Sequence, residues 1–156
     1  MTVAHETPDQ PDVISLIKEL DDYQDTLYPP EARYALDLNS LKASNVIFVV
    51  ARDHVGKAVG CGALVLDSGR GELKRMYVQP ASRGQGIAQK IIAALEAAAT
   101  ERGCVALKLE TGPRQPEALS FYSKQGYRTC GPFGSYPEDP LSVFMEKNLA
   151  QHQSEA

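Results

Sequence analysis

A short glycine loop with one arginine is the part of this chain best suited to bind a charged ligand. A strand-like run ending at Val78 precedes it, and an amphipathic run that predicts a helix up to Gly103 follows it. A helix that begins inside such a loop presents unpaired N–H groups and the positive end of its dipole. The loop therefore predicts a pyrophosphate-binding site, formed by Arg83, Gly84, Gln85, Gly86, Ile87 and Ala88.

Other phosphate-binding loops fit this sequence less well. A Walker loop is excluded because no Gly-Lys-Ser/Thr follows the glycines. The dinucleotide fingerprint needs a third Gly or Ala where this chain has Gln89, and it follows a strand that is buried on both faces. Glu110 nevertheless lies at a suitable distance for a ribose-binding acid, so the dinucleotide interpretation is disfavoured but open. An ordinary strand–helix connection with a solvated Arg83 is the simplest alternative.

Two segments resemble signatures of the GNAT superfamily, the acyl-CoA-dependent N-acyltransferases. The loop is similar to the R-x-x-G-x-A/G signature, and residues 76–80 are similar to the strand that leads into it. Residues 115–127 resemble the N-x-x-A-x-x-F-Y-x-x-x-G-F/Y segment, with Gln115 where asparagine is usual. The resemblance covers roughly residues 46–147. It implies a twisted mixed sheet in which two parallel strands splay apart.

The resemblance also implies which residues bind the co-substrate, acetyl-CoA. Its pantetheine arm would pair with backbone near Met76 and Val78, and an N–H group near Met76 or Tyr77 would meet the oxyanion. The glycine loop at 83–88 would hold the pyrophosphate. Lys124 is a candidate contact for the ribose phosphate.

Acyl transfer to an amine needs a deprotonated amine and a proton for the leaving thiolate. Tyr122 is the candidate acid by its place in the second motif, because a phenol of pKa about 10 can protonate a thiolate of pKa about 8.5. Packing against Ala118 and Leu119 is the alternative role. Glu72 is the first candidate base, since several family members carry a glutamate on this strand, although a solvated acid is equally compatible. Glu110, at the end of a neighbouring strand, is the second candidate.

The elements that position these residues alternate along the chain without repeats. Helices are predicted at 11–23, with Asp9 as N-cap, at about 31–38, at 87–103 and at 116–125. Strands are predicted at 46–52, 58–66, 72–78, 105–110, 127–130 and 141–147. The fold class is α/β, a mixed sheet of about six or seven strands flanked by about four helices. Residues 1–150 are predicted to form a single domain, followed by a polar tail at 151–156.

Composition limits the partners of the chain. It has 156 residues, 43% hydrophobic and 23% charged, with a net charge of −4 that argues against nucleic acid. No apolar run has membrane-spanning length, and the N-terminal segment is polar, which predicts a cytoplasmic protein without membrane contact. The three cysteines and three histidines lack metal-binding spacing, so no metal is expected.

The predicted activity is direct, sequential transfer of an acetyl group from acetyl-CoA to a primary amine of a small molecule. By resemblance, residues 21–25 and 28–37 form one wall of the acceptor cleft, and the loop at 131–140 could form the opposite lip. The acidic excess suits a cationic amine, whereas Arg33 could hold a carboxylate. A non-catalytic acyl-CoA sensor and a nucleotide-binding oxidoreductase are the alternatives. A homodimer is compatible with the resemblance, because dimers are common among the apparent relatives.

Overall fold

The structure, a computed structural model, describes residues 1–32, 37–134 and 136–149. Its helices are α1 (Pro11–Leu27), α2 (Leu38–Leu41), α3 (Ile87–Glu101) and α4 (Pro116–Lys124), with 3₁₀ turns at Pro30–Ala32 and Pro80–Ser82. Its strands are β1 (Thr2–His5), β2 (Val46–Arg52), β3 (Ala58–Asp67), β4 (Arg70–Val78), β5 (Ala106–Thr111), β6 (Arg128–Cys130) and β7 (Val143–Asn148). No helix within these described ranges is long and apolar enough to cross a membrane.

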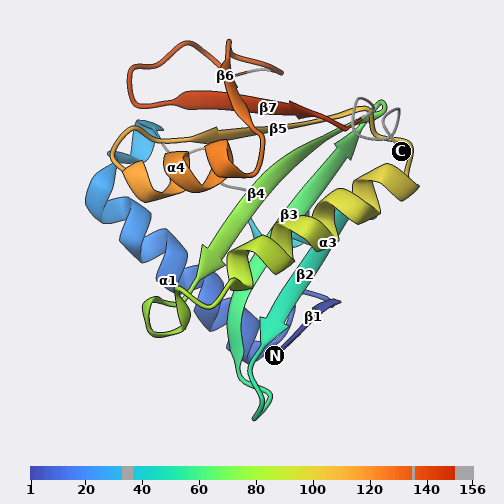
Figure 1. Ribbon diagram of the computed structural model, residues 1–156. Coiled ribbons are helices and arrows are strands. Elements are labelled where there is room, and N and C mark those ends of the chain that lie inside the picture. Colours follow the sequence, from blue (N-terminus) through green and yellow to red (C-terminus); the bar gives the residue numbers. More distant parts are fainter. Residues whose placement is uncertain (33–36, 135, 150–156) are drawn as a thin grey trace.

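The strands form one mixed sheet in the order β1-β2-β3-β4-β5-β7-β6 (Figure 1). Strands β1 to β4 are antiparallel neighbours, β4 and β5 are parallel, and β7 pairs antiparallel with both β5 and β6. The parallel pair requires a crossover, which α3 supplies. The α/β class and the mixed sheet predicted from the sequence are therefore confirmed.

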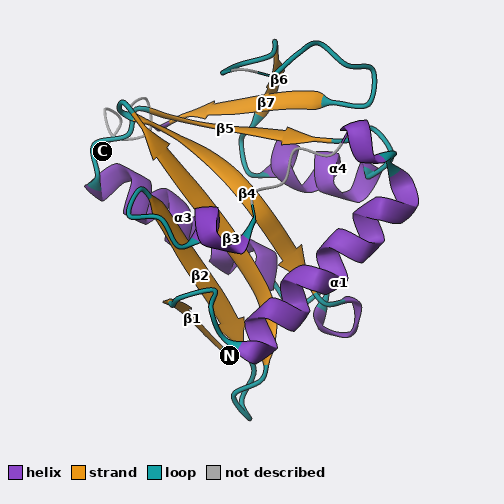
Figure 2. Ribbon diagram, turned by 180° about the vertical axis from the view of Figure 1, so that it is seen from behind, coloured by secondary structure: helices purple, strands orange, loops and turns teal. Residues whose placement is uncertain are grey.

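Helices cover both faces of the sheet. Figure 1 shows α3 and α4 in front, and Figure 2 shows α1 on the opposite face. Ile91 and Leu95 of α3 belong to one buried cluster with strand residues, whereas Leu16 of α1 belongs to a second cluster on the other face. Helix α3 packs closely, since a Cβ at Gly62 of β3 would lie 2.7 Å from Ile91 Cγ2. This contact fixes the axis of α3 relative to the strands.

The most consequential feature of the sheet is the short pairing between β4 and β5. The two strands pair only from Arg70 opposite Ala106 to Leu73 opposite Leu109. Beyond that point they diverge toward their carboxyl ends (Figure 1), while β4 stays paired with β3. The predicted splay is thus confirmed.

A β-bulge bends β4 just after the last pair with β5. The register with β3 shifts between Cys61 and Ala63, so that Arg75 and Met76 oppose Gly62. Arg75 has φ +58°, in the left-handed region. Its guanidinium forms an ion pair with Asp21 of α1, and the Cys61 thiol donates to its carbonyl at 3.2 Å. These contacts hold the bulge in place.

The N-terminal part of the chain differs from the sequence prediction. Helix α1 continues to Leu27, beyond the predicted end at Tyr23, because no helix-breaking residue occurs before Pro29. Its N-cap is Gln10 and not the predicted Asp9, whose carboxylate instead bonds to Lys42 at 3.2 Å.

Two further N-terminal predictions need correction. Strand β1 was missed because it is a short edge strand whose residues are mostly exposed, which leaves little apolar alternation. The predicted helix at about 31–38 is wrong at both ends. A 3₁₀ turn occupies Pro30–Ala32, and α2 begins only at Leu38. Residues 33–36, which include Arg33, lie outside the described residues, as does the predicted tail at 151–156.

Candidate active site

Two adjoining cavities occupy the opening between β4 and β5. The large cavity, of about 570 Å³, is lined by the end of β4, the glycine loop, the first turn of α3 and one side of α4. The small cavity, of about 120 Å³, is lined by the bulge of β4, the end of β5 and the C-terminal part of α1. The residues that line both are Leu20, Met76, Gln115, Ala118 and Tyr122.

The glycine loop has the conformation that an anion-binding turn requires. Gly84 and Gly86 have φ +81° and +77°, which L-residues rarely adopt. A Cβ at Gly84 would meet no atom within 4 Å, and one at Gly86 only the Gln89 side chain at 3.6 Å. Gly86 is also the N-cap of α3 and offers no side chain to its N–H groups. The first turn of α3 therefore presents open backbone donors to the large cavity.

Arg83 joins the loop to the end of β4. Its Nε donates to the Val78 carbonyl at 2.9 Å, and its guanidinium lies 5.8 Å from the centroid of the Tyr77 ring. The residue lines the large cavity. A fixed positive charge therefore stands beside the open N–H groups of the loop.

Tyr122 of α4 stands where the two cavities meet. Its side chain is 8% exposed and packs edge-on against Phe121 and Tyr127. Burial raises the pKa of the Tyr122 phenol above its ordinary value. The hydroxyl is thus protonated at neutral pH, and it is a weaker acid than an exposed phenol.

Among the described residues that line the small cavity, one carries a carboxyl group, Glu110 at the end of β5. Burial raises the pKa of Glu110 to about 7, while the nearby Ser142 hydroxyl and the charge of Lys74 act in the opposite direction. A carboxyl group with this pKa exchanges protons readily near neutral pH, which suits a general base.

Glu72, the first candidate base, lines neither cavity. Its carboxylate accepts a hydrogen bond from the Tyr136 hydroxyl at 2.5 Å and forms an ion pair with Lys74 at 3.1 Å. These contacts tie the segment that carries Tyr136 to the sheet. The role of Glu72 as base stays a prediction, and the geometry favours Glu110.

The family model that matches residues 13–127 is the acetyltransferase (GNAT) family. The chain belongs to the GNAT family. It is 47% identical to the IAA acetyltransferase of Azospirillum brasilense, over 96% of this chain and 98% of that protein. These findings identify the chain as an acyl-CoA N-acyltransferase, an acetyltransferase.

Solved structures agree with this membership. A crystal structure of a candidate acyl-CoA N-acyltransferase from Klebsiella pneumoniae superposes with a TM-score of 0.81 at 44% identity, covering 95% of this chain and 97% of that one. An aminoglycoside 6'-N-acetyltransferase solved with coenzyme A has a TM-score of 0.74 at 17% identity, covering 96% and 97% of the two chains, and so shares the fold.

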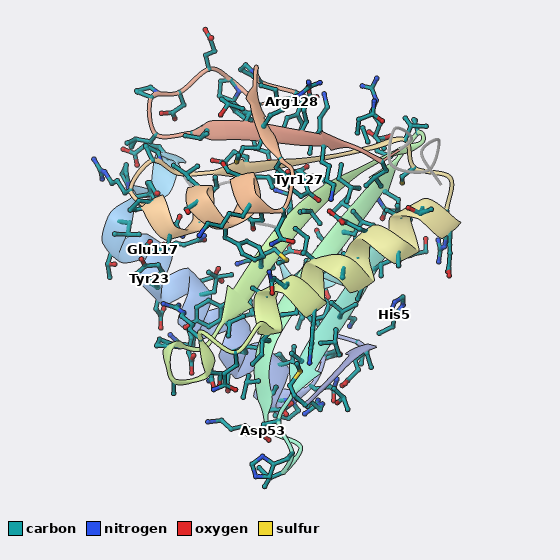
Figure 3. All side chains as sticks on the ribbon, viewed as in Figure 1. His5, Tyr23, Asp53, Glu117, Tyr127 and Arg128 are labelled. Atoms are coloured by element: carbon teal, nitrogen blue, oxygen red, sulfur yellow. The ribbon has the colours of Figure 1, made fainter. Side chains whose placement is uncertain are left out.

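Most residues predicted to bind acetyl-CoA line the large cavity of this acetyltransferase. They are Met76, Tyr77, Val78, Arg83, Gly84, Gly86, Ile87, Ala88 and Lys124, whereas Gln85 does not line it. The prediction omitted Tyr23 of α1 and Glu117 of α4, which reach the cavity from two helices (Figure 3). Tyr23 belongs to the predicted wall of the acceptor cleft at 21–25, but it lines the large cavity and not the small one, because α1 crosses the sheet beside both.

The acceptor side of the acetyltransferase matches the prediction in part. Gln24 and Tyr28, from the predicted wall, line the small cavity. No described residue of the loop at 131–140 does so, and only the adjacent Leu141 reaches the cavity. In the loop itself, the rings of Phe133 and Tyr136 pack edge-on and tilted, respectively, against Phe144 of β7.

The raised pKa of Glu110 makes the stability of the acetyltransferase depend on pH. Because the pKa of Glu110 in the folded state, about 7, exceeds its ordinary value of about 4.5, its contribution to stability is fully present below pH 4.5 and is lost as pH rises through 7. Glu110→Gln removes the free-energy cost of ionising this carboxyl group in the folded state. We expect the variant to gain about 3 kcal/mol over the wild type between about pH 4 and about pH 8.

Urea unfolding of both proteins at the two pH values measures this difference. Glu72→Gln is the control, and it should gain no stability at the higher pH because it breaks the contacts with Lys74 and Tyr136. An equal effect of Glu110→Gln at both pH values would show that burial does not hold this carboxyl group neutral.

Proposed function

We propose that this acetyltransferase transfers an acetyl group from acetyl-CoA directly to a primary amine of a small molecule. The observation that carries the proposal is the meeting of two cavities at Tyr122, one beside the glycine loop and the other beside Glu110. Two substrates can then approach each other from opposite sides, which is the arrangement that a sequential reaction needs.

The large cavity fits the nucleotide end of a CoA thioester. Open N–H groups at the start of α3, together with Arg83, suit a pyrophosphate, and Lys124 on α4 supplies a further charge. In the proposal, the pantetheine arm runs along β4 near Met76 and Val78. The strand offers backbone there because its pairing with β5 ends at Leu73.

The two proton transfers of the reaction are assigned to Glu110 and Tyr122. Glu110 accepts a proton from the ammonium group of the acceptor, and Tyr122 donates one to the departing thiolate. No cysteine among the described residues lines either cavity, which favours direct transfer over an acyl-cysteine route. The paired acid and base also favour catalysis over a non-catalytic sensor role.

The size of the small cavity favours a small acceptor. Its volume of about 120 Å³ is below that of a cavity of about 150 Å³ that holds benzene. The related protein of Azospirillum brasilense is named an IAA acetyltransferase, and IAA is for that reason tested beside the amines. The cytoplasm as location and a homodimer as assembly stay predictions.

The first prediction concerns binding of CoA to the loop. Gly86→Val places a branched side chain in the glycine loop, where the pyrophosphate would bind. It should abolish the rise in melting temperature that CoA produces in the wild type. Gly103→Val is a matched control, because Gly103 has the same φ of +77° but lies beyond the opposite end of α3. It should melt lower yet keep the CoA-dependent shift. Equal shifts in both variants, or equal stabilisation of the wild type by NAD, would contradict the proposal.

The second prediction concerns Tyr122. Tyr122→Phe removes the hydroxyl and keeps the ring packed against Phe121 and Tyr127. We expect kcat to fall by about 10²-fold or more, while the affinity for acetyl-CoA changes little. Steady-state kinetics and CoA titration measure the two quantities. Wild-type turnover in this variant would leave Tyr122 as a packing residue only.

The third prediction distinguishes the two candidate bases. A base with pKa about 7 should give kcat/KM an ascending limb near neutral pH, and Glu110→Gln should remove that limb. Glu72→Gln should keep it, because Glu72 lines neither cavity. The pH profiles of both variants decide the assignment. Loss of the limb in Glu72→Gln alone would return the role to Glu72.

A further inference from the structure

Tyr28 closes the small cavity from the end of α1. It is the C-cap of that helix and is only 7% exposed, although it lies outside regular secondary structure. Its hydroxyl accepts a hydrogen bond from the Arg114 N–H at 3.2 Å. The Arg114 guanidinium lies 5.9 Å from the Tyr28 ring centroid and donates to the Leu27 carbonyl. The end of α1 is thereby clamped to the segment between β5 and α4.

Gly112 provides the space that the Tyr28 ring occupies. A Cβ at Gly112 would lie 1.8 Å from the Tyr28 hydroxyl and 2.2 Å from Cζ, and the three atoms nearest to it all belong to Tyr28. The φ of Gly112 lies outside the left-handed region, so its backbone alone does not demand glycine. The contact with Tyr28 is the reason that a side chain does not fit here.

Tyr28 forms an uncharged part of the wall of the small cavity, beside several charged residues. The two cations that line it already have carboxylate partners, Lys74 with Glu72 and Arg75 with Asp21. Glu110 is the proposed base. The packed ring of Tyr28 thus adds bulk but no charge to the wall of this cavity.

We propose that Tyr28, seated against Gly112, is the specificity-determining residue that restricts the acceptor to short, unbranched primary amines. The inference rests on the proposed function. It assigns a cause to the small volume of the cavity, and it makes Gly112, which itself lines that cavity, a positioning residue that acts through Tyr28.

The test compares two amines that share an aminoethyl group, 2-aminoethanol and 2-phenylethylamine. Tyr28→Ala should raise the ratio of kcat/KM for the bulky amine over the short one by about tenfold or more. Gly112→Ala should raise it as well, because its methyl group displaces the ring. The double variant should match Tyr28→Ala, since no ring remains to be displaced. Tyr28→Phe should return the ratio toward the wild-type value.

The controls separate this inference from the proposed function. Gly131→Ala adds a methyl group where no atom lies within 4 Å and should leave the ratio unchanged. The KM for acetyl-CoA, measured in every variant, reports whether the large cavity is intact. An unchanged ratio in both Tyr28→Ala and Gly112→Ala, or a Tyr28→Phe ratio equal to that of Tyr28→Ala, overturns the inference.

Failure of the proposed function has a different signature, namely no acetylation of either amine by the wild type. Crystal structures of the wild type and Tyr28→Ala then decide the inference. The inference requires that the volume of the small cavity be larger in Tyr28→Ala than in the wild type. An unchanged volume overturns it.

Discussion

Strands β4 and β5 run parallel and remain paired for four residue pairs, the last between Leu73 and Leu109. The left-handed conformation of Arg75 then bends β4 away while β4 keeps its bonds to β3. Such a conformation costs of the order of 1–2 kcal/mol for a residue other than glycine. The ion pair with Asp21 and the thiol bond from Cys61 offset this cost. The opening that results holds both cavities, so the site depends on this bend.

The end of the pairing also gives the two candidate bases different surroundings. Glu110 directly follows Leu109, the last β5 residue that pairs with β4, so its side chain lies at the opening and loses water there. Burial without full compensation is what brings its pKa to about 7. Glu72 lies within the paired stretch, opposite Lys108, and its carboxylate is used by Lys74 and Tyr136. Glu72 thus lies one pair before the end of the paired stretch, whereas Glu110, the proposed base, lies one residue beyond that end.

The sequence predicts those parts of the fold that local patterns determine. Strand β2 has the predicted bounds, Val46–Arg52, because it is a continuous β-rich run. The glycine loop was found because glycines with positive φ and a following amphipathic helix leave a local signature. The bulge at Arg75 has no such signature, since a charged residue in the left-handed region is stabilised by Asp21 and Cys61, both distant in the chain. Ranking Glu110 above Glu72 needs the position of the last strand pair, which periodicity does not report.

Helix α1 shows how one such error affects the site. Leu20, Gln24 and Tyr28 follow one another at intervals of one helical turn, and all three line the small cavity. A helix that ended at Tyr23, as predicted, would stop about 6 Å short of the observed end. The last turn of α1 is therefore what brings Tyr28 to Gly112. Glu19 of the same helix accepts hydrogen bonds from Tyr77 and Gln79 at the end of β4. One helix therefore contacts β4 near the glycine loop and also closes the small cavity, so in the proposed function α1 sets the distance between the two substrates.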